Sequence, residues 1–133
     1  MVRRVLDLHI HSKYSRACSK DLNFSNIAAA CVTRGIDIVA TGDFTHPAWL
    51  AAIREELVED TSGIFRLRAE TSPTRFILGT EISSIKKHAG ETRRVHHLIF
   101  APDIRAVEKF NHALEARGCN LRADGRPILG LTS

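Results

Sequence analysis

The chain has 133 residues, enough for one domain with a sizeable hydrophobic core. Its 44% hydrophobic and 26% charged residues are typical of a globular protein, and a formal net charge of +4 mildly favours anionic partners such as nucleic acid. No apolar stretch is long enough to cross a membrane, and no signal-peptide segment or disulfide framework is evident. These features exclude an integral membrane protein and predict a cytoplasmic one with reduced thiols.

Hydrophobic periodicity and turn residues predict alternating strands and helices. In the first half these are a strand over about 3–10, a helix over about 26–34, a buried strand over 36–43 and a helix that starts after Pro47 and runs to about Val58. A loop at "EDTSG" and a short strand at "IFRLR" follow; then come strands at "RFILGTEISSIKK" and "TRRVHHLIFA", joined by a hairpin at "HAGE", and a helix from Asp103 to Arg117. Ser25 and Asp103 are the expected N-caps, and Gly35 is the expected stop of the first helix. This order predicts an α/β fold with a largely parallel sheet and one β-hairpin.

The segment "DLHIH" places three potential metal ligands on alternate positions of the first strand. Because a strand points residues i, i+2 and i+4 to one face, Asp7, His9 and His11 are expected to converge. The alternate apolar residues, Leu6 and Leu8 among them, are expected to face a core.

Further His and carboxylate side chains occur where other predicted strands end. Asp43 and His46 follow the second strand, Glu81 lies in "GTEIS", and His96 and His97 lie in "RVHHLIF". Loops at the carboxyl ends of parallel strands converge, so these groups are candidates for one site. Mixed imidazole and carboxylate ligands suit Zn, Mn or Fe, and a bridging carboxylate such as Glu81 could hold two ions roughly 3.5–4 Å apart.

Each of these residues also has an ordinary structural explanation. Asp43 after a glycine could be a turn residue, His46 could pack over the following helix, and Glu81 could be an exposed edge charge. Alternation alone does not choose between His96 and His97. Four independent chance placements at strand ends are improbable together, which favours the metal site.

The motifs "DLHIHS", "GTEIS" and "VHHLIF", with the Gly-Asp turn, resemble the motif series of the PHP (polymerase and histidinol phosphatase) superfamily. Within it, "DLHIHSKYSRACSKDLN", "GDFTHPAWL", "EISSI", "RRVHHLIFAPD" and "DGRPILGL" are similar to endonuclease Q across essentially the whole chain. The resemblance implies a distorted PHP-type (βα)7 barrel around two or three divalent ions (Zn, Mn, Fe or Mg). It also implies a metal-dependent phosphodiesterase of DNA repair, which nicks DNA 5′ to deaminated bases or abasic sites.

Carried over onto this sequence, the resemblance implies metal ligation by His9, His11, Asp43, Glu81 and His96. His96 is preferred to His97 because the family motif places its histidine directly after the apolar residue. Asp7 matches an acidic family position and is expected to ligate or to orient His9. Asp7, Asp43 and Glu81 are the carboxylates assigned to catalysis. Asp7, His46 and His97 are further ligand candidates. For His46 the match with the family is incomplete, because the sequence has "DFTH" where the family usually has "DH".

PHP domains supply further ligands from late strands, and endonuclease Q continues beyond "GRPILGL". Residues 1–133 are therefore expected to be a single truncated PHP domain, the N-terminal half of the barrel. A half barrel would expose sheet edges and apolar faces, favouring self-association, and would be catalytically weak.

Three hypotheses of function follow. The leading one is a DNA phosphodiesterase module acting on damaged DNA, with Lys13, Arg16, Arg93 and Arg94 as candidates to hold the backbone. The alternatives are a PHP-type phosphatase for a small phosphomonoester, and an inactive fragment that binds metal or DNA. No membrane partner is expected. Whether the segment is an enzyme on its own is left open.

Overall fold

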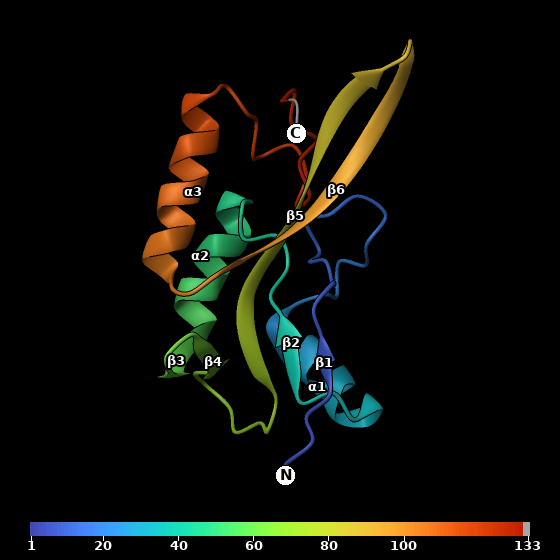
Figure 1. Cartoon of the computed structure of the whole chain (residues 1–133). Helices are drawn as coiled ribbons and strands as arrows, with labels where there is room; N and C mark the ends of the chain where they lie inside the picture. Colours follow the sequence, from blue (N-terminus) through green and yellow to red (C-terminus); the bar gives the residue numbers. More distant parts are fainter. Residues whose placement is uncertain (132–133) are drawn as a thin grey trace.

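The computed structural model describes residues 1–131, which form a mixed α/β unit (Figure 1). In this part of the chain the strands are β1 (Leu6–Asp7), β2 (Ile38–Ala40), β3 (Leu57–Thr61), β4 (Ile64–Leu67), β5 (Arg75–His88) and β6 (Glu91–Ala101). The helices are α1 (Phe24–Arg34), α2 (Pro47–Glu56) and α3 (Ile104–Ala116). No helix among residues 1–131 is both long and apolar enough to span a membrane.

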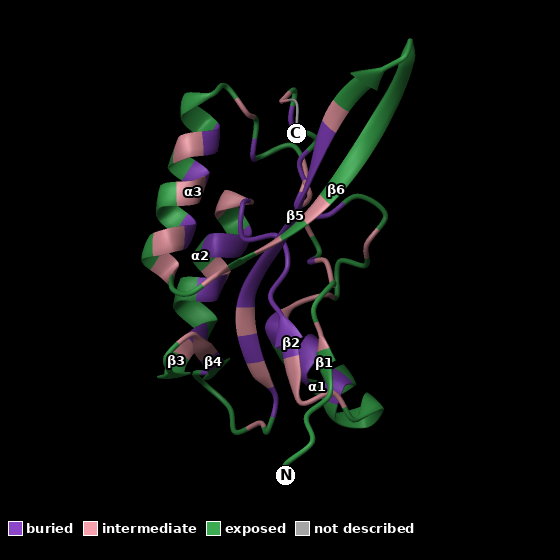
Figure 2. Ribbon diagram, viewed as in Figure 1, coloured by how far each residue is buried: buried purple, intermediate pink, exposed green. Residues whose placement is uncertain are grey.

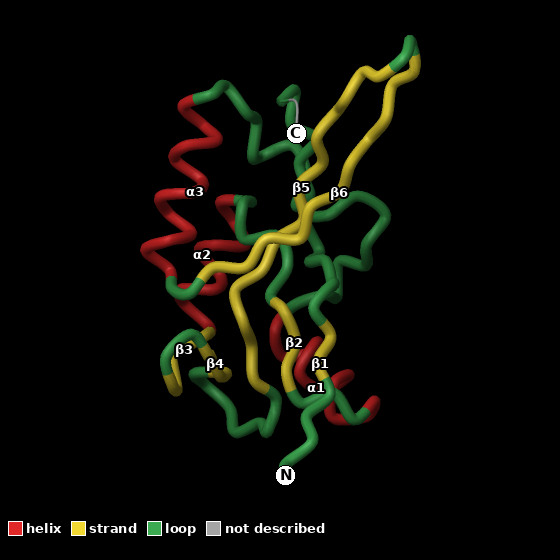
Figure 3. Tube along the Cα trace, viewed as in Figure 1, coloured by secondary structure: helices red, strands yellow, loops and turns green. Residues whose placement is uncertain are grey.

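The strands form one sheet in the order β1-β2-β5-β4-β3, with β6 paired to β5 (Figure 3). β1, β2 and β5 run parallel, whereas β3, β4 and β6 pair antiparallel to their neighbours. The predicted parallel arrangement therefore holds for these three strands, and the predicted hairpin is β5–β6. The segment 127–131 pairs with β5 at Ser83. The Ser83 amide donates a hydrogen bond to the Pro127 carbonyl, and the Ser83 carbonyl accepts one from the Leu129 amide.

All three helices contribute to one hydrophobic core against the sheet (Figure 2). Phe24 of α1 stacks on Trp49 of α2 with ring centroids 4.1 Å apart, and meets Phe76 of β5 edge-on. The indole of Trp49 donates a hydrogen bond to the carbonyl of Thr41, which joins α2 to the loop after β2. The core therefore fixes the strand ends from which the polar motifs project.

The helix boundaries follow the capping residues. Gly35 ends α1 in a left-handed conformation and Asp103 caps α3, as predicted. Helix α1 begins two residues earlier than expected, because Asn23 rather than Ser25 accepts the hydrogen bond from a first-turn amide. Pro47 lies in the first turn of α2, also as predicted, but the helix ends at Glu56 because Leu57 and Val58 belong to β3.

Two predictions for the strands were wrong. The acidic residues of "EDTSG" belong to β3, whose pairing with β4 outweighs their low β-propensity. The first strand is only two residues long and lies at the sheet edge, so Leu6 and Leu8 are exposed instead of facing a core. Ile10 alone of this apolar set packs against the core.

The turn after β2 passes very close to the segment that carries His9 and His11. Gly42 has a φ of 62°, and a Cβ there would lie 2.3 Å from the backbone oxygen of Ile10. No side chain fits at that distance, so glycine is required for the two segments to meet.

We predict that Gly42→Ala lowers the free energy of unfolding by about 2 kcal/mol or more, because the added methyl overlaps the Ile10 backbone. Gly35→Ala is the matched control: Gly35 has a φ of 71° but nothing within 4 Å, so only the backbone strain of about 1 kcal/mol applies. Chemical denaturation measures both variants. Equal destabilisation would show that the close approach is unimportant.

Candidate metal centre

Glu81 lies in the middle of β5 and is the centre of a cluster of imidazoles. Its side chain is 4% exposed. His9 Nε2 lies 2.6 Å and His11 Nε2 3.0 Å from Glu81 Oε2, while His96 Nδ1 on β6 contacts Glu81 Oε1. Donor atoms of His9, His11 and Glu81 all lie within 4.8 Å of one another. Residues far apart in the sequence thus present three imidazoles to one carboxylate.

The cluster favours an ionised carboxylate. Burial alone would raise the pKa of Glu81, but hydrogen bonds from His9 and His96 and the nearby charges of His11 and His9 hold this pKa below its ordinary value. His11 is largely buried, whereas the side chains of His9 and His96 are about half exposed. The cluster is therefore firmly held on the protein side and open to solvent on the other.

This donor set fits a divalent transition-metal ion. Imidazole nitrogens and a carboxylate oxygen are the usual ligands of Zn²⁺, and Mn²⁺ and Fe²⁺ accept the same mixture. His9, His11 and Glu81 are near enough together to hold one ion, with His96 beside them. Three protein ligands with an open side are typical of catalytic rather than structural ions.

Asp43 lies behind His11, away from the open side. Its Oδ1 is 3.1 Å from His11 Nδ1. Its Oδ2 accepts hydrogen bonds from the Ser12 amide at 2.6 Å, the Ser12 hydroxyl at 2.6 Å and the Ser15 hydroxyl at 2.8 Å. The side chain is completely buried, so the structure places Asp43 as a support for His11 and not among the atoms that face Glu81.

The contact with Asp43 also selects the useful form of the His11 ring. When Nδ1 carries the proton and its N–H donates a hydrogen bond to Asp43, the lone pair of Nε2 is left for an ion on the Glu81 side. Such carboxylate–histidine pairs orient metal ligands and raise their basicity. Asp43 was predicted to be a ligand and a catalytic group; in this structure its carboxylate contacts His11, Ser12 and Ser15 and not Glu81.

The support around Asp43 includes residues that the sequence did not single out. Asp43 has a left-handed backbone with a φ of 51°, which places its side chain beneath the His11 loop. Gly125 packs directly over it, since a Cβ on Gly125 would lie 2.3 Å from Asp43 Oδ2. The Gly125 amide donates to the carbonyl of Tyr14, closing the loop over the site. The "ADGRP" turn was recognisable in the sequence, but its contact with Asp43 was not.

His46 does not join the Glu81 cluster. It caps α2 by accepting a hydrogen bond at Nδ1 from the Ala48 amide, and its ring stacks on Tyr14 with centroids 4.4 Å apart. Burial lowers the pKa of His46, which favours the neutral ring that the cap requires. Its position matches the structural explanation considered above.

Asp7 and His97 also point elsewhere. Asp7 accepts a hydrogen bond from the backbone amide of His9 at 3.2 Å. This contact holds the backbone of His9 and not its imidazole ring. His97 bonds to Ser84 on the face of the hairpin opposite His96.

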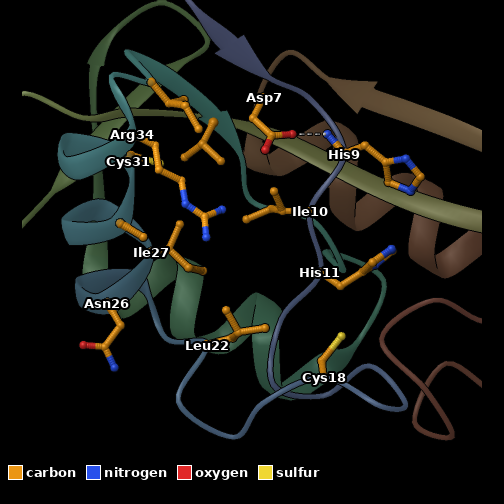
Figure 4. A pocket seen from close by; sticks show the side chains of 13 residues that line it. Asp7, His9, Ile10, His11, Cys18, Leu22, Asn26, Ile27, Cys31 and Arg34 are labelled. Atoms are coloured by element: carbon orange, nitrogen blue, oxygen red, sulfur yellow. Dashed lines mark hydrogen bonds between the residues drawn. The ribbon is translucent and has the colours of Figure 1, made fainter.

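A cavity of about 340 Å³ between α1 and the segment after β1 is bordered by Asp7, His9 and His11 (Figure 4).

The basic candidates lie in two regions. Lys13 has its amine 5.5 Å from the centre of the Tyr14 ring, and exposed Arg16 is tied through its backbone to Asp124. Arg93 and Arg94 are exposed on β6, beyond His96.

Comparisons with known proteins identify a related sequence and similar structures. No family model matches the chain. It is 34% identical over 126 residues to an uncharacterised protein of Methanocaldococcus jannaschii, and this match covers 95% of the chain but 13% of that protein. The fold is similar to a crystal structure of endonuclease Q in complex with a 27-mer duplex substrate with an abasic lesion at the active site, with a TM-score of 0.80 and 35% identity. It is also similar to the lesion-specific endonuclease PfuEndoQ of Pyrococcus furiosus, with a TM-score of 0.79 and 31% identity.

The two structural matches cover 96% and 95% of this chain and 29% of each endonuclease Q chain. Closeness to endonuclease Q, which the sequence motifs indicated, is therefore supported by the fold. The mixed α/β arrangement is consistent with part of a PHP-type barrel.

We predict that His96→Ala weakens Zn²⁺ or Mn²⁺ binding by at least about tenfold, because it removes an imidazole beside Glu81. His97→Ala is the matched control, since the neighbouring ring lies on the other face of β6. Isothermal titration and elemental analysis measure the ion bound, with the His9→Ala, His11→Ala double variant expected to bind none. Equal losses from His96→Ala and His97→Ala would refute the assignment.

A second prediction concerns the support behind the ligands. Asp43→Asn should lower metal affinity by roughly 10–100-fold, because the amide supports His11 less well and can direct an N–H group at Ser12 and Ser15. Metal titration is paired with a thermal melt, because the buried change also costs stability. If Asp43→Asn keeps its fold and its full metal affinity, Asp43 does not orient His11.

Proposed function

We propose that this chain is the metal-binding part of a DNA repair endonuclease resembling endonuclease Q. The observation that carries the proposal is the His9–His11–Glu81 group, set in a chain that matches an endonuclease Q–DNA complex over 96% of its length. The proposed reaction is hydrolysis of a phosphodiester bond on the 5′ side of a deaminated base or an abasic site. It is proposed for a protein that joins this segment to the further regions found in endonuclease Q.

The residues of the cluster suit such a reaction. A bound divalent ion supplies Lewis-acid chemistry to a phosphate and lowers the pKa of water. Glu81 and the three imidazoles would hold the ion, and Asp43 would keep the His11 ring in its orientation. The half-exposed rings of His9 and His96 leave the outer side open for a phosphate.

We further propose that the segment belongs to one PHP-type domain whose remaining metal ligands come from other parts of that domain. Among residues 1–131 the candidate group can hold one ion, whereas the family pattern implies two or three. Zn, Mn, Fe and Mg remain the candidate ions, because the mixed ligands do not select one.

The proposal predicts lesion-dependent, metal-dependent nicking by the full product of the gene that encodes this chain. Labelled duplexes with one deoxyuridine, one abasic site or no lesion are incubated with metal or with a chelator, and the products are sized on a sequencing gel. We expect cutting 5′ to each lesion, and loss of at least about a hundredfold in rate in Glu81→Gln, which keeps the shape but removes the ligand charge.

Equal cutting of damaged and undamaged duplexes would contradict the proposal, as would cutting that resists the chelator. Hydrolysis of a small phosphomonoester without any DNA cleavage would instead favour the phosphatase alternative. His97→Ala serves as the control for nonspecific damage to the hairpin, since His97 lies away from the cluster.

A further inference from the structure

The net positive charge of the chain arises mainly at the end of the β5–β6 hairpin. Residues 85–95, "IKKHAGETRRV", contain four Lys or Arg residues and one Glu. The rest of the chain has fifteen Lys or Arg and fourteen Asp or Glu residues, and is almost neutral. The mild overall excess is therefore a local feature of one exposed element.

This end of the hairpin projects away from the body of the protein (Figure 1). Its turn has positive φ at Ala89 and Gly90, the backbone of a tight two-residue turn. Residues 86–96 are all exposed, and Lys86 pairs directly with Arg93 across the strands. Like charges in that position destabilise a hairpin that has no core of its own. Such a composition is expected where the hairpin meets an anionic partner.

The two faces of the hairpin are not equivalent. His96 bonds to Glu81 and Ser83, whereas His97 bonds to Ser84, so these contacts identify the face that carries the metal cluster. By the strand alternation, Arg94 lies on the His96 side, two residues or about 7 Å further out.

Lys87 continues this row. It pairs with Thr92, and Arg94 pairs with Ile85 on the same face, so Lys87 and Arg94 are diagonal neighbours. The opposite face carries Lys86 and Arg93, and the Arg93 guanidinium is 3.7 Å from the Glu91 carboxylate. Within residues 1–131, neither Lys87 nor Arg94 makes an ion pair.

We propose that Arg94 and Lys87 bind the phosphate backbone of duplex DNA and lead it to the Glu81 cluster. This inference rests on the proposed function and makes it more specific, because it assigns the contact to one face of the hairpin. Duplex DNA fits this row, since it presents a regular line of negative charges to a narrow basic ribbon. The row also begins two residue pairs from His96, where the scissile phosphate would lie. Arg93, a candidate from the sequence, faces away and is excluded from this contact.

Adjacent residues on opposite faces provide matched variants. Lys87→Gln is compared with Lys86→Gln, and Arg94→Gln with Arg93→Gln, so that each pair removes the same charge from the same strand. Binding of the 133-residue chain to a fluorescein-labelled duplex is followed by anisotropy at several salt concentrations, in the presence of a chelator. The measurement therefore needs neither bound metal nor catalysis.

We expect Lys87→Gln and Arg94→Gln each to weaken binding several-fold and to reduce the slope of log affinity against log salt by about 1. Lys86→Gln and Arg93→Gln should change the slope by less than half as much. Circular dichroism should be the same for all four variants. Equal losses on both faces, or no loss on either, would overturn the proposal. The second result, no loss on either face, is the one expected if the hairpin binds an acidic protein instead of DNA.

The outcome is separate from that of the nicking assay. If the face difference is found but the gene product does not nick DNA, the hairpin contact stands and the proposed endonuclease fails. If nicking is found without a face difference, the endonuclease stands and this contact fails.

Discussion

The structure depends on the polar contacts that stabilise one buried carboxylate. Glu81 lies within a sheet, where an unpaired charge would be costly, and three imidazoles from two other segments surround it. For these rings to reach it, β6 must pair with β5 in one register, and the segment after β1 must pass over the strand ends. Gly42 permits that passage because it leaves room for the Ile10 backbone. The site and the sheet are therefore specified together.

The register of the β5–β6 hairpin connects the site to the exposed basic residues. A slip of one residue would turn His96 and Arg94 to the opposite face and bring His97 and Arg93 to the face that carries Glu81. The tight turn at Ala89 and Gly90 fixes the pairing at the outer end. At the inner end, β5 is held by β2 and by the aromatic core around Phe76. The candidate metal ligand His96 and the cationic side chains on its face thus depend on the same pairing.

Local signals in the sequence predicted the helices and the main strands, whereas features set by distant contacts were missed. Asp103 and Gly35 were found because caps depend on neighbouring residues. Helix α1 began early because Asn23 competes with Ser25 for the same role. Alternation could not choose between His96 and His97, since a face is defined only by its partner strand. The support that Ser12, Ser15 and Gly125 give to Asp43 arises from contacts between residues 31, 28 and 82 positions apart in the sequence, which no local motif encodes.

The charges around His11 explain why the cluster is suited to a cation. The ring lies between two carboxylates, Asp43 on one side and Glu81 on the other. Among residues 1–131, no Lys or Arg side chain forms an ion pair with either carboxylate; their only ionic partners are histidines. With neutral imidazoles this pair of negative charges would be unbalanced, and a divalent ion at the Glu81 side would balance them while using the imidazole lone pairs. The cationic row of Arg94 and Lys87 begins outside this centre, so it can attract a phosphate without displacing the ion. The proposed metal-binding charge and the proposed DNA-binding charge thus lie at separate places on one face of the protein.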